Sequence, residues 1–230
     1  RGAVASARTR IELAIDSALA SNSLPYTHFL SLPLSSPAVV AALTKLKASV
    51  LEAEGAEAAG IEDSIFWDPR QLHLTLGMLK LYSAQRRHAA RTAIKALDLK
   101  DVLGGEPMKI RLRGLEYMND DPSEVDVLYM KVEVPDRRLE DICERVIETF
   151  TDAELLLPQD ARPVKLHATV MNTRLRAGGG KRQGFDARKV LAVHGADFDL
   201  GEHKLDGIHL SQRGVFDDDG YYHCVVKASM

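Results

Sequence analysis

The chain has 230 residues, of which 45% are apolar and 27% charged, a composition typical of a globular protein with one large domain or two lobes around a shared core. Its net charge of -3 excludes a uniformly basic protein that coats nucleic acid, and it leaves room for a local basic patch. No segment approaches the roughly 20 apolar residues of a membrane-spanning helix, so we expect no membrane partner.

The pattern of apolar residues predicts helices and strands along the whole chain. Apolar residues three and four positions apart indicate helices, and short apolar runs bounded by turn-forming residues indicate strands. In chain order, we predict a helix at 3–20, a strand at 27–34, a helix at 37–54, a strand at 71–79, a helix at 84–97, strands at 108–117 and 125–134, a helix at 136–151, a strand at 164–171, a basic glycine-rich loop at 174–183, a helix at 186–193, and strands at 205–212 and 221–227.

One tetrapeptide pattern, His-apolar-Thr-apolar, occurs twice inside predicted strands, once from His73 and again 94 residues later from His167. Successive side chains of a strand point to opposite faces, so His73 and Thr75 share one face, as do His167 and Thr169. Each strand therefore buries an aliphatic side and presents one imidazole and one hydroxyl on the opposite side.

The elements that follow the two histidines also recur at nearly constant spacing. A Gly-Leu pair begins at Gly114 and a Gly-Ile pair begins at Gly207, 93 residues later, and the strand segments 127–132 and 222–226 occupy matching places. This shared order indicates an internal duplication. It predicts an α+β fold with two lobes related by a pseudo-twofold axis, in which two antiparallel sheets flanked by helices surround a central groove.

Two imidazoles and two hydroxyls that face one groove are the groups that phosphodiester cleavage requires. Histidine titrates near neutral pH, so one imidazole can act as a base while the other, protonated, acts as an acid. A threonine hydroxyl donates a hydrogen bond to a phosphate oxygen without adding charge. We therefore assign His73, Thr75, His167 and Thr169 as catalytic residues, and the sequence leaves open which histidine is the acid.

A zinc site at the two motif histidines is the alternative interpretation of the same residues. Zinc usually takes three or four N, O or S ligands, and no acidic, Cys or His companion lies at short spacing from either motif. The two cysteines, Cys143 and Cys224, also lack such companions, so we expect free thiols. We therefore expect neither a metal nor another cofactor.

Four further residues near the motifs are candidates for substrate binding. Trp67 precedes the first motif and either stacks on a base or anchors its loop. Lys165 shares a strand face with His167 and either neutralises phosphate or is simply exposed. Arg174 and Arg176 begin a basic cluster, which either contacts a polynucleotide backbone or forms a solvated loop. The cluster continues with Lys181, Arg182, Arg188 and Lys189.

Five segments of the chain resemble one known superfamily. They read THFLSLPL, LHLTLGML, GLEYMNDDPSEVDVLYMKV, VKLHATVMNT and IHLSQRG. They resemble the two-histidine (2H) phosphoesterase superfamily, and within it the phosphoesterase-like domains of activating signal cointegrator 1 complexes. They also resemble, more distantly, the 2′-5′ RNA ligase-like domains of A-kinase anchoring proteins. The resemblance covers residues 26–227 and implies a bilobal 2H domain over 24–230.

The first 23 residues resemble a different module. They are similar to the C-terminal helix of a KH-type domain, an RNA-binding module whose Gly-x-x-Gly loop is not in this chain. Because the sequence begins at Arg1 rather than Met, we expect it to be a fragment that lacks the rest of the KH domain.

The resemblance implies a metal-independent phosphodiesterase, a hydrolase that acts on RNA ends, 2′,3′-cyclic phosphates or 2′-5′ linkages. It implies that His73 and His167 act as acid and base and that Thr75 and Thr169 bind phosphate. It further implies a nuclear location, with the cytoplasm as a second one, and other subunits of a complex for transcription coactivation and DNA alkylation repair as partners. The alternative is a module that holds RNA or a partner without turnover.

Overall fold

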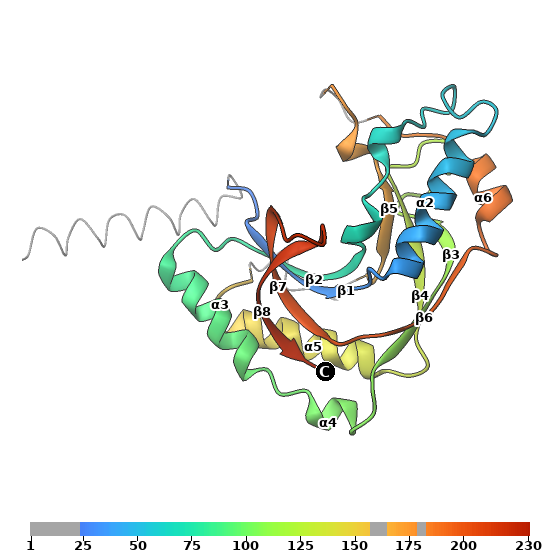
Figure 1. Cartoon of the computed structure of the whole chain (residues 1–230). Coiled ribbons are helices and arrows are strands. Elements are labelled where there is room, and N and C mark those ends of the chain that lie inside the picture. The colour runs from blue at the N-terminus through green and yellow to red at the C-terminus, as the bar shows by residue number, and fades with distance from the viewer. Residues whose placement is uncertain (1–23, 157–164, 179–182) are drawn as a thin grey trace, which may run out of the picture.

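The computed structural model describes residues 24–156, 165–178 and 183–230 (Figure 1). The predicted helix at 3–20, the KH-like segment 1–23, and the basic residues Lys181 and Arg182 lie outside these ranges. Within the described ranges, no helix combines the length and apolarity that a membrane span requires.

The described elements follow the predicted order closely. The strands are β1 (His28–Pro33), β2 (His73–Leu79), β3 (Lys109–Tyr117), β4 (Val127–Glu133), β5 (Ala168–Asn172), β6 (Asp199–Lys204), β7 (Gly207–Phe216) and β8 (Tyr222–Ser229). The α-helices are α2 (Pro37–Leu51), α3 (Ala84–Ala96), α4 (Lys100–Leu103), α5 (Arg138–Asp152) and α6 (Arg188–His194), and the 3-10 turns are η1 (Asp63–Ile65), η2 (Pro69–Gln71) and η3 (Thr173–Leu175). Among the strands and α-helices, two were not predicted, because α4 is a single turn and β6 is mostly polar. The three 3-10 turns were not predicted either.

Local signals explain where the longer helices begin. Ser36 accepts a hydrogen bond from the backbone nitrogen of Val39, and Pro37 occupies the first turn of α2. Ser83 caps α3 in the same way, by accepting from the nitrogen of Arg86. These caps satisfy backbone donors that a helix start otherwise leaves without partners.

The strands form one antiparallel sheet in the order β6-β3-β4-β5-β2-β1-β7-β8. Its two four-stranded halves meet at β5 and β2, where Leu74 and Ala168 are register partners. The predicted bilobal α+β class is therefore confirmed, with the correction that the two predicted sheets join along the motif strands. They join because the motif strands hydrogen-bond to each other instead of facing each other across open space.

The predicted pseudo-twofold relation is visible in the strand order. Outward from the junction, β2, β1, β7 and β8 in one half correspond to β5, β4, β3 and β6 in the other. Gly114 and Gly207 thus lie on corresponding strands, β3 and β7, as predicted. The predicted match of 127–132 with 222–226 is wrong, because β4 lies second from the junction whereas β8 forms the outer edge of its half.

The helices cover one face of the sheet. α3 contacts β7 and β8, α5 contacts β2, and α6 contacts β3, and Figure 1 shows α3 and α5 along one half and α2 and α6 along the other. Leu74, Leu76 and the buried residues of these helices form one continuous core on what we call the helix face. The opposite face, here called the histidine face, carries a separate apolar cluster without any helix residue. Its members are Phe29, Tyr221 and Tyr222, with Trp67 and Met78 packed against them.

Candidate active site

The two motif strands place their polar residues on the histidine face. Leu74 of β2 and Ala168 of β5 are fully buried on the helix face. Because side chains alternate along a strand, the residues on either side of each point to the histidine face. His73, Thr75, His167 and Thr169 are all partly exposed there, as predicted from the alternation.

The pairing of β2 with β5 sets the arrangement of these four side chains. Leu74 pairs with Ala168 in antiparallel register, so counting outward by one residue sets His73 opposite Thr169 and Thr75 opposite His167. The two imidazoles therefore lie diagonally across the strand junction, each opposite the other motif's hydroxyl. Side chains in this diagonal relation are within reach of a single small group bound between them.

Both histidines make the same backbone hydrogen bond. Nδ1 of His73 lies 2.7 Å from the carbonyl oxygen of Gln71, and Nδ1 of His167 lies 2.6 Å from that of Lys165. A carbonyl oxygen only accepts, so each Nδ1 carries the hydrogen and each neutral ring has its lone pair on Nε2. In His73 this Nε2 lies 3.1 Å from the hydroxyl of Thr75, which donates to it.

Aromatic rings surround His73. The ring centroids of Phe29, Tyr222 and Trp67 lie 5.0, 5.6 and 6.3 Å from that of the imidazole. Burial in this apolar enclosure disfavours the charged imidazolium and lowers the pKa of His73 to about 4, against the weaker opposing effect of its backbone hydrogen bond. His73 is therefore neutral near pH 7.

Polar and charged groups surround His167. The ring of Tyr129 lies 5.4 Å from the imidazole, edge to face, and its hydroxyl donates to Glu116 at 2.8 Å. Lys165 Nζ lies 5.3 Å from the centre of the Tyr129 ring, and Lys131 pairs with Glu116 at 3.4 Å. Burial and the charge of Lys165 lower the pKa of His167, while its bond to the Lys165 carbonyl raises it.

Trp67 and Lys165 lie beside the histidines, one on each side of the junction. The ring of Trp67 faces His73, and its backbone nitrogen donates to the carbonyl of Val170 in β5 at 2.8 Å, so this residue links both motif strands. Lys165 is exposed, with its ammonium over Tyr129. A hydrogen bond to Tyr129 raises the pKa of Lys165, so the side chain is a cation near pH 7.

The two predicted arginines are not brought to the histidines by any described contact. The side chain of Arg174 is exposed on η3. Arg176 pairs with the carboxylate of Glu62 at 3.2 Å and donates to the carbonyl of Gly60 at 2.9 Å. Its guanidinium therefore holds neighbouring loops together. Farther along the cluster, Arg188 pairs with Asp186 and Lys189 donates to the carbonyl of Glu54.

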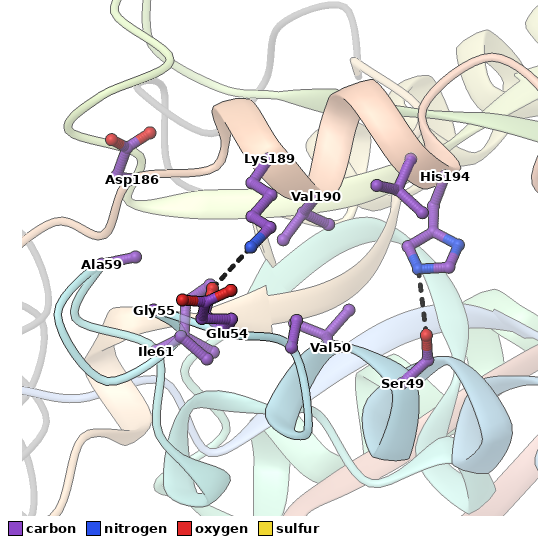
Figure 2. Close-up of a pocket in the computed structure, with 13 residues that line it drawn as sticks. Ser49, Val50, Glu54, Gly55, Ala59, Ile61, Asp186, Lys189, Val190 and His194 are labelled. Carbon is purple, nitrogen blue, oxygen red and sulfur yellow. Dashed lines mark hydrogen bonds between the residues drawn. The ribbon is translucent and has the colours of Figure 1, made fainter.

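A pocket of about 470 Å³ lies between α2 and α6, away from the motif residues (Figure 2). Figure 2 shows it crossed by two hydrogen bonds, from Lys189 to the carbonyl of Glu54 at 2.6 Å and between Ser49 and His194 at 3.3 Å. Most of its remaining lining is small or apolar, and none of the motif residues contributes. The pocket is therefore separate from the motif residues of the histidine face.

Sequence analysis missed the residues that make the two environments different. Phe29, Tyr222, Tyr129 and Glu116 come from β1, β8, β4 and β3, far from either motif in the sequence. Because Leu30 is buried, alternation along the strand places its neighbour Phe29 on the opposite face of β1. Only the strand order shows that Phe29 lies on the same face as His73 and next to it. Within the described residues, no three His, Cys, Asp or Glu side chains gather into a metal-binding group.

The antiparallel sheet with its helices has the fold of the LigT-like 2H phosphoesterases. The solved structure of TT0787 of Thermus thermophilus superposes with a TM-score of 0.57 and 21% identity, covering 88% of this chain and 97% of that one. The apo form of E. coli LigT superposes with a TM-score of 0.56 and 13% identity, covering 89% and 97%. E. coli LigT has also been solved with 3′-AMP, and that chain superposes with a TM-score of 0.52 and 13% identity, covering 90% and 99%.

Within this fold, the chain belongs to the AKAP7 2′5′ RNA ligase-like domain family, whose model matches residues 26–230. A curated relative is activating signal cointegrator 1 complex subunit 1 of Mus musculus, which is 37% identical over 96% of this chain and 67% of its own length. An uncharacterized protein of Schizosaccharomyces pombe is 27% identical over 68% of this chain and 76% of its own length.

Proposed function

We propose that this 2H phosphoesterase domain is a phosphodiesterase that hydrolyses RNA or nucleotide phosphodiesters without a metal ion, using His73 and His167 as base and acid. Candidate linkages are 2′,3′-cyclic phosphates at RNA ends and 2′-5′ bonds. The observation that carries the proposal is the shared tautomer: each Nδ1–H is held by a carbonyl two residues earlier, which puts the lone pair of each ring on Nε2. The two rings lie diagonally across one strand junction, so a phosphate bound between them would be next to both.

The different surroundings of the two histidines favour one assignment of roles. His73 is enclosed by aromatic rings and is neutral near pH 7, so we assign it as the base. His167 is in contact with one aromatic ring, that of Tyr129, and lacks the enclosure by three aromatic rings that disfavours protonation of His73, so we assign it as the acid. Thr169 then donates a hydrogen bond to a non-bridging phosphate oxygen, and Thr75 does the same once its hydroxyl turns from Nε2 of His73 to the bound phosphate.

Hydrolysis of a 2′,3′-cyclic phosphate by these groups balances as follows. Nε2 of His73 accepts a proton from water as the water oxygen bonds to phosphorus. One P–O bond to the ribose breaks, and the departing oxygen takes the proton from Nε2 of protonated His167. Each turnover leaves His73 protonated and His167 neutral, so proton exchange with solvent restores the starting state.

A panel of short RNAs with defined ends tests this proposal. It contains 2′,3′-cyclic ends, 3′-phosphate ends, and dinucleotides with 2′-5′ or 3′-5′ linkages, incubated with the protein in EDTA and analysed by mass spectrometry. We expect one class to be opened with addition of one water, and no product with the His73→Ala/His167→Ala double variant. Failure of the folded protein to open any substrate would contradict the enzymatic proposal.

A binding module is the second candidate, and one observation favours it. Nε2 of His73 is already occupied by the Thr75 hydroxyl, and the enclosing rings resist protonation of this histidine. A site of this kind can hold a nucleotide without cleaving it. Binding of the same RNAs without any product would select this candidate.

We further propose that the chain acts as a subunit of an activating signal cointegrator complex, in the nucleus, with roles in transcription coactivation and alkylation repair. The support is its similarity to the mouse subunit over 96% of its length. Co-purification of the tagged chain with cointegrator subunits from nuclear extract tests this proposal, and recovery of the chain alone would oppose it.

A further inference from the structure

Phe216 is an exposed aromatic residue in ring contact with the candidate active site. It ends β7, its side chain is 49% exposed, and its register partner on β8 is Tyr222. The two ring centroids lie 5.2 Å apart at an interplanar angle of 39°. Tyr222 in turn lies 5.6 Å from His73 and 4.9 Å from Phe29. A continuous series of ring contacts therefore runs from an exposed surface to the imidazole that we assign as the base.

The turn that follows Phe216 is held by several hydrogen bonds. Asp217 donates its backbone N–H to the carbonyl of Tyr221 at 2.8 Å, and its carboxylate lies 2.8 Å from Nδ1 of His223. Gly220 donates to the carbonyl of Asp217 at 2.9 Å. These bonds hold the backbone of the turn, and the contact with Tyr222 supports one side of the Phe216 ring. A supported ring loses less conformational freedom than a mobile one when a ligand stacks on it.

The turn is also packed against the segment that leads to the first motif. A Cβ atom added at Gly220 would lie 2.8 Å from the guanidinium of Arg70, and Arg70 pairs with Asp68 at 2.6 Å. Trp67, which is in ring contact with His73, immediately precedes Asp68. The hairpin and this segment therefore form one wall, with aromatic rings on its side toward the histidine.

Single exposed apolar side chains are common on protein surfaces and alone indicate nothing. Val215, the neighbour of Phe216 on β7, is 40% exposed, and alternation directs it to the other face of the strand. What distinguishes Phe216 is that its ring contacts Tyr222, at a tilted angle, and that Tyr222 in turn contacts His73. An aromatic surface one ring away from a phosphate-binding position suits a nucleobase, because every base offers a flat π face.

We propose that Phe216, backed by Tyr222, is a stacking platform for the base of the nucleotide whose phosphate lies between His73 and His167. This inference rests on the proposed function, and it narrows the substrate class to phosphodiesters that carry a base next to the reacting phosphate. Stacking does not distinguish one base from another, so the platform should bind nucleotides of several bases with similar affinity.

Equilibrium binding of two probes tests the platform without requiring turnover. The probes are 3′-AMP and ribose 3-phosphate, which share the phosphate and differ in the base, measured by calorimetry. We expect Phe216→Ala to weaken binding of 3′-AMP by about 5- to 150-fold, the range for loss of one stacked base. Ribose 3-phosphate should bind equally to both proteins. Phe216→Trp should retain the affinity for 3′-AMP, and Val215→Ala, which removes an equally exposed side chain, should leave it unchanged.

Three results of the binding experiment would overturn the platform. They are unchanged binding of 3′-AMP to Phe216→Ala, an equal loss for both probes, and wild-type protein that binds 3′-AMP no better than ribose 3-phosphate. A defect of Phe216→Ala confined to assembly with partner proteins would assign the ring to a protein contact and also overturn it. Hydrolysis is measured separately. Base-dependent binding without cleavage would support the platform and reject the proposed phosphodiesterase activity. Cleavage by Phe216→Ala at the wild-type rate and affinity would reject the platform and leave the proposed activity in place.

Discussion

His73 and His167 share a tautomer but not an environment, and this difference is the basis of the roles that we propose for them. The carbonyl oxygens of Gln71 and Lys165 fix the rings in the same way. Aromatic rings around one imidazole and polar groups around the other then separate their affinities for protons. Two titrating groups in distinct surroundings are the usual basis of an acid–base pair.

The first prediction at the residue scale concerns the pH dependence of hydrolysis. The rate should rise as pH increases through the pKa of His73, near 4, because the base must be neutral. It should fall as pH increases through the pKa of His167, which burial holds below its ordinary value of 6.5, because the acid must be protonated. A profile of kcat/KM should therefore be bell-shaped, with its maximum below pH 6.5 and with two pKa values that belong to the pair. A maximum above pH 7.5 would contradict this.

The second prediction concerns stability. His73 has a pKa of about 4 when folded and 6.5 when exposed, so the unfolded chain binds the proton more tightly. Above pH 6.5, the titration of His73 therefore does not affect the free energy of unfolding. Between pH 6.5 and 4 it lowers this free energy progressively, by roughly 3 kcal/mol in total. Urea denaturation of His73→Gln should show a shallower loss of stability across this window than wild-type protein. Parallel curves would mean that His73 accepts a proton freely in the folded state.

The third prediction concerns the two hydroxyls. Thr75→Ala and Thr169→Ala should each lower kcat by up to about tenfold, because a neutral hydrogen bond contributes about 0.5–1.5 kcal/mol net. Thr75→Ser and Thr169→Ser keep the hydroxyl and serve as matched controls that should retain most of the activity. If a Thr→Ala change lowered kcat as much as the loss of a histidine does, that threonine would have to take part in proton transfer.

At the scale of elements, alternation along β2 and β5 was sufficient to predict which side chains share a face. It predicts His73 with Thr75 and His167 with Thr169, because each is flanked by aliphatic residues that must be buried. The pairing partners of a strand depend on the whole chain. For that reason the sequence did not show that Leu74 pairs with Ala168, or that Phe29 and Tyr222 border the first histidine.

The turn between β7 and β8 offers a prediction at this scale. Gly220 has a φ of 83°, and a Cβ atom there would meet the Arg70 guanidinium, whereas Gly105 has the same φ of 83° with no atom within 4 Å. Gly105→Ala should thus cost only the left-handed strain, about 1 kcal/mol. Gly220→Ala should cost slightly more, because the Arg70 guanidinium, the far end of an exposed and flexible side chain, must also shift from its position beside Asp68. Chemical denaturation measures both, and equal losses would mean that Arg70 moves aside freely.

At the scale of the whole molecule, the junction of the two halves creates the site. Neither half holds both histidines, and the loop through Trp67 ties them together by bonding to Val170 and contacting His73. The sequence predicted two related lobes because the motif recurs after 94 residues. It did not predict their fusion into one sheet, because register between distant strands leaves no local signal.

The basic cluster shows the same limit of sequence reasoning. Its charges left two interpretations open, contact with an RNA backbone and a solvated loop. In the folded chain, Arg176, Arg188 and Lys189 each bond to neighbouring loops or residues, and such contacts are set by the tertiary structure, which composition does not encode. The RNA-contact interpretation of Arg174 and Arg176 stays a prediction.

The most direct test of the account is the turnover number of the two single-histidine variants and the double variant, measured in EDTA on the substrate that the wild-type protein opens fastest. Each proton-transfer role is worth about 10²–10⁴-fold, so His73→Ala and His167→Ala should each lower kcat by that factor. Because the two groups act as a unit, the double variant should lose far less than the product of the two single effects. Full activity in either folded single variant, or a wild-type activity that EDTA abolishes and a divalent ion restores, would contradict acid–base catalysis by the two histidines.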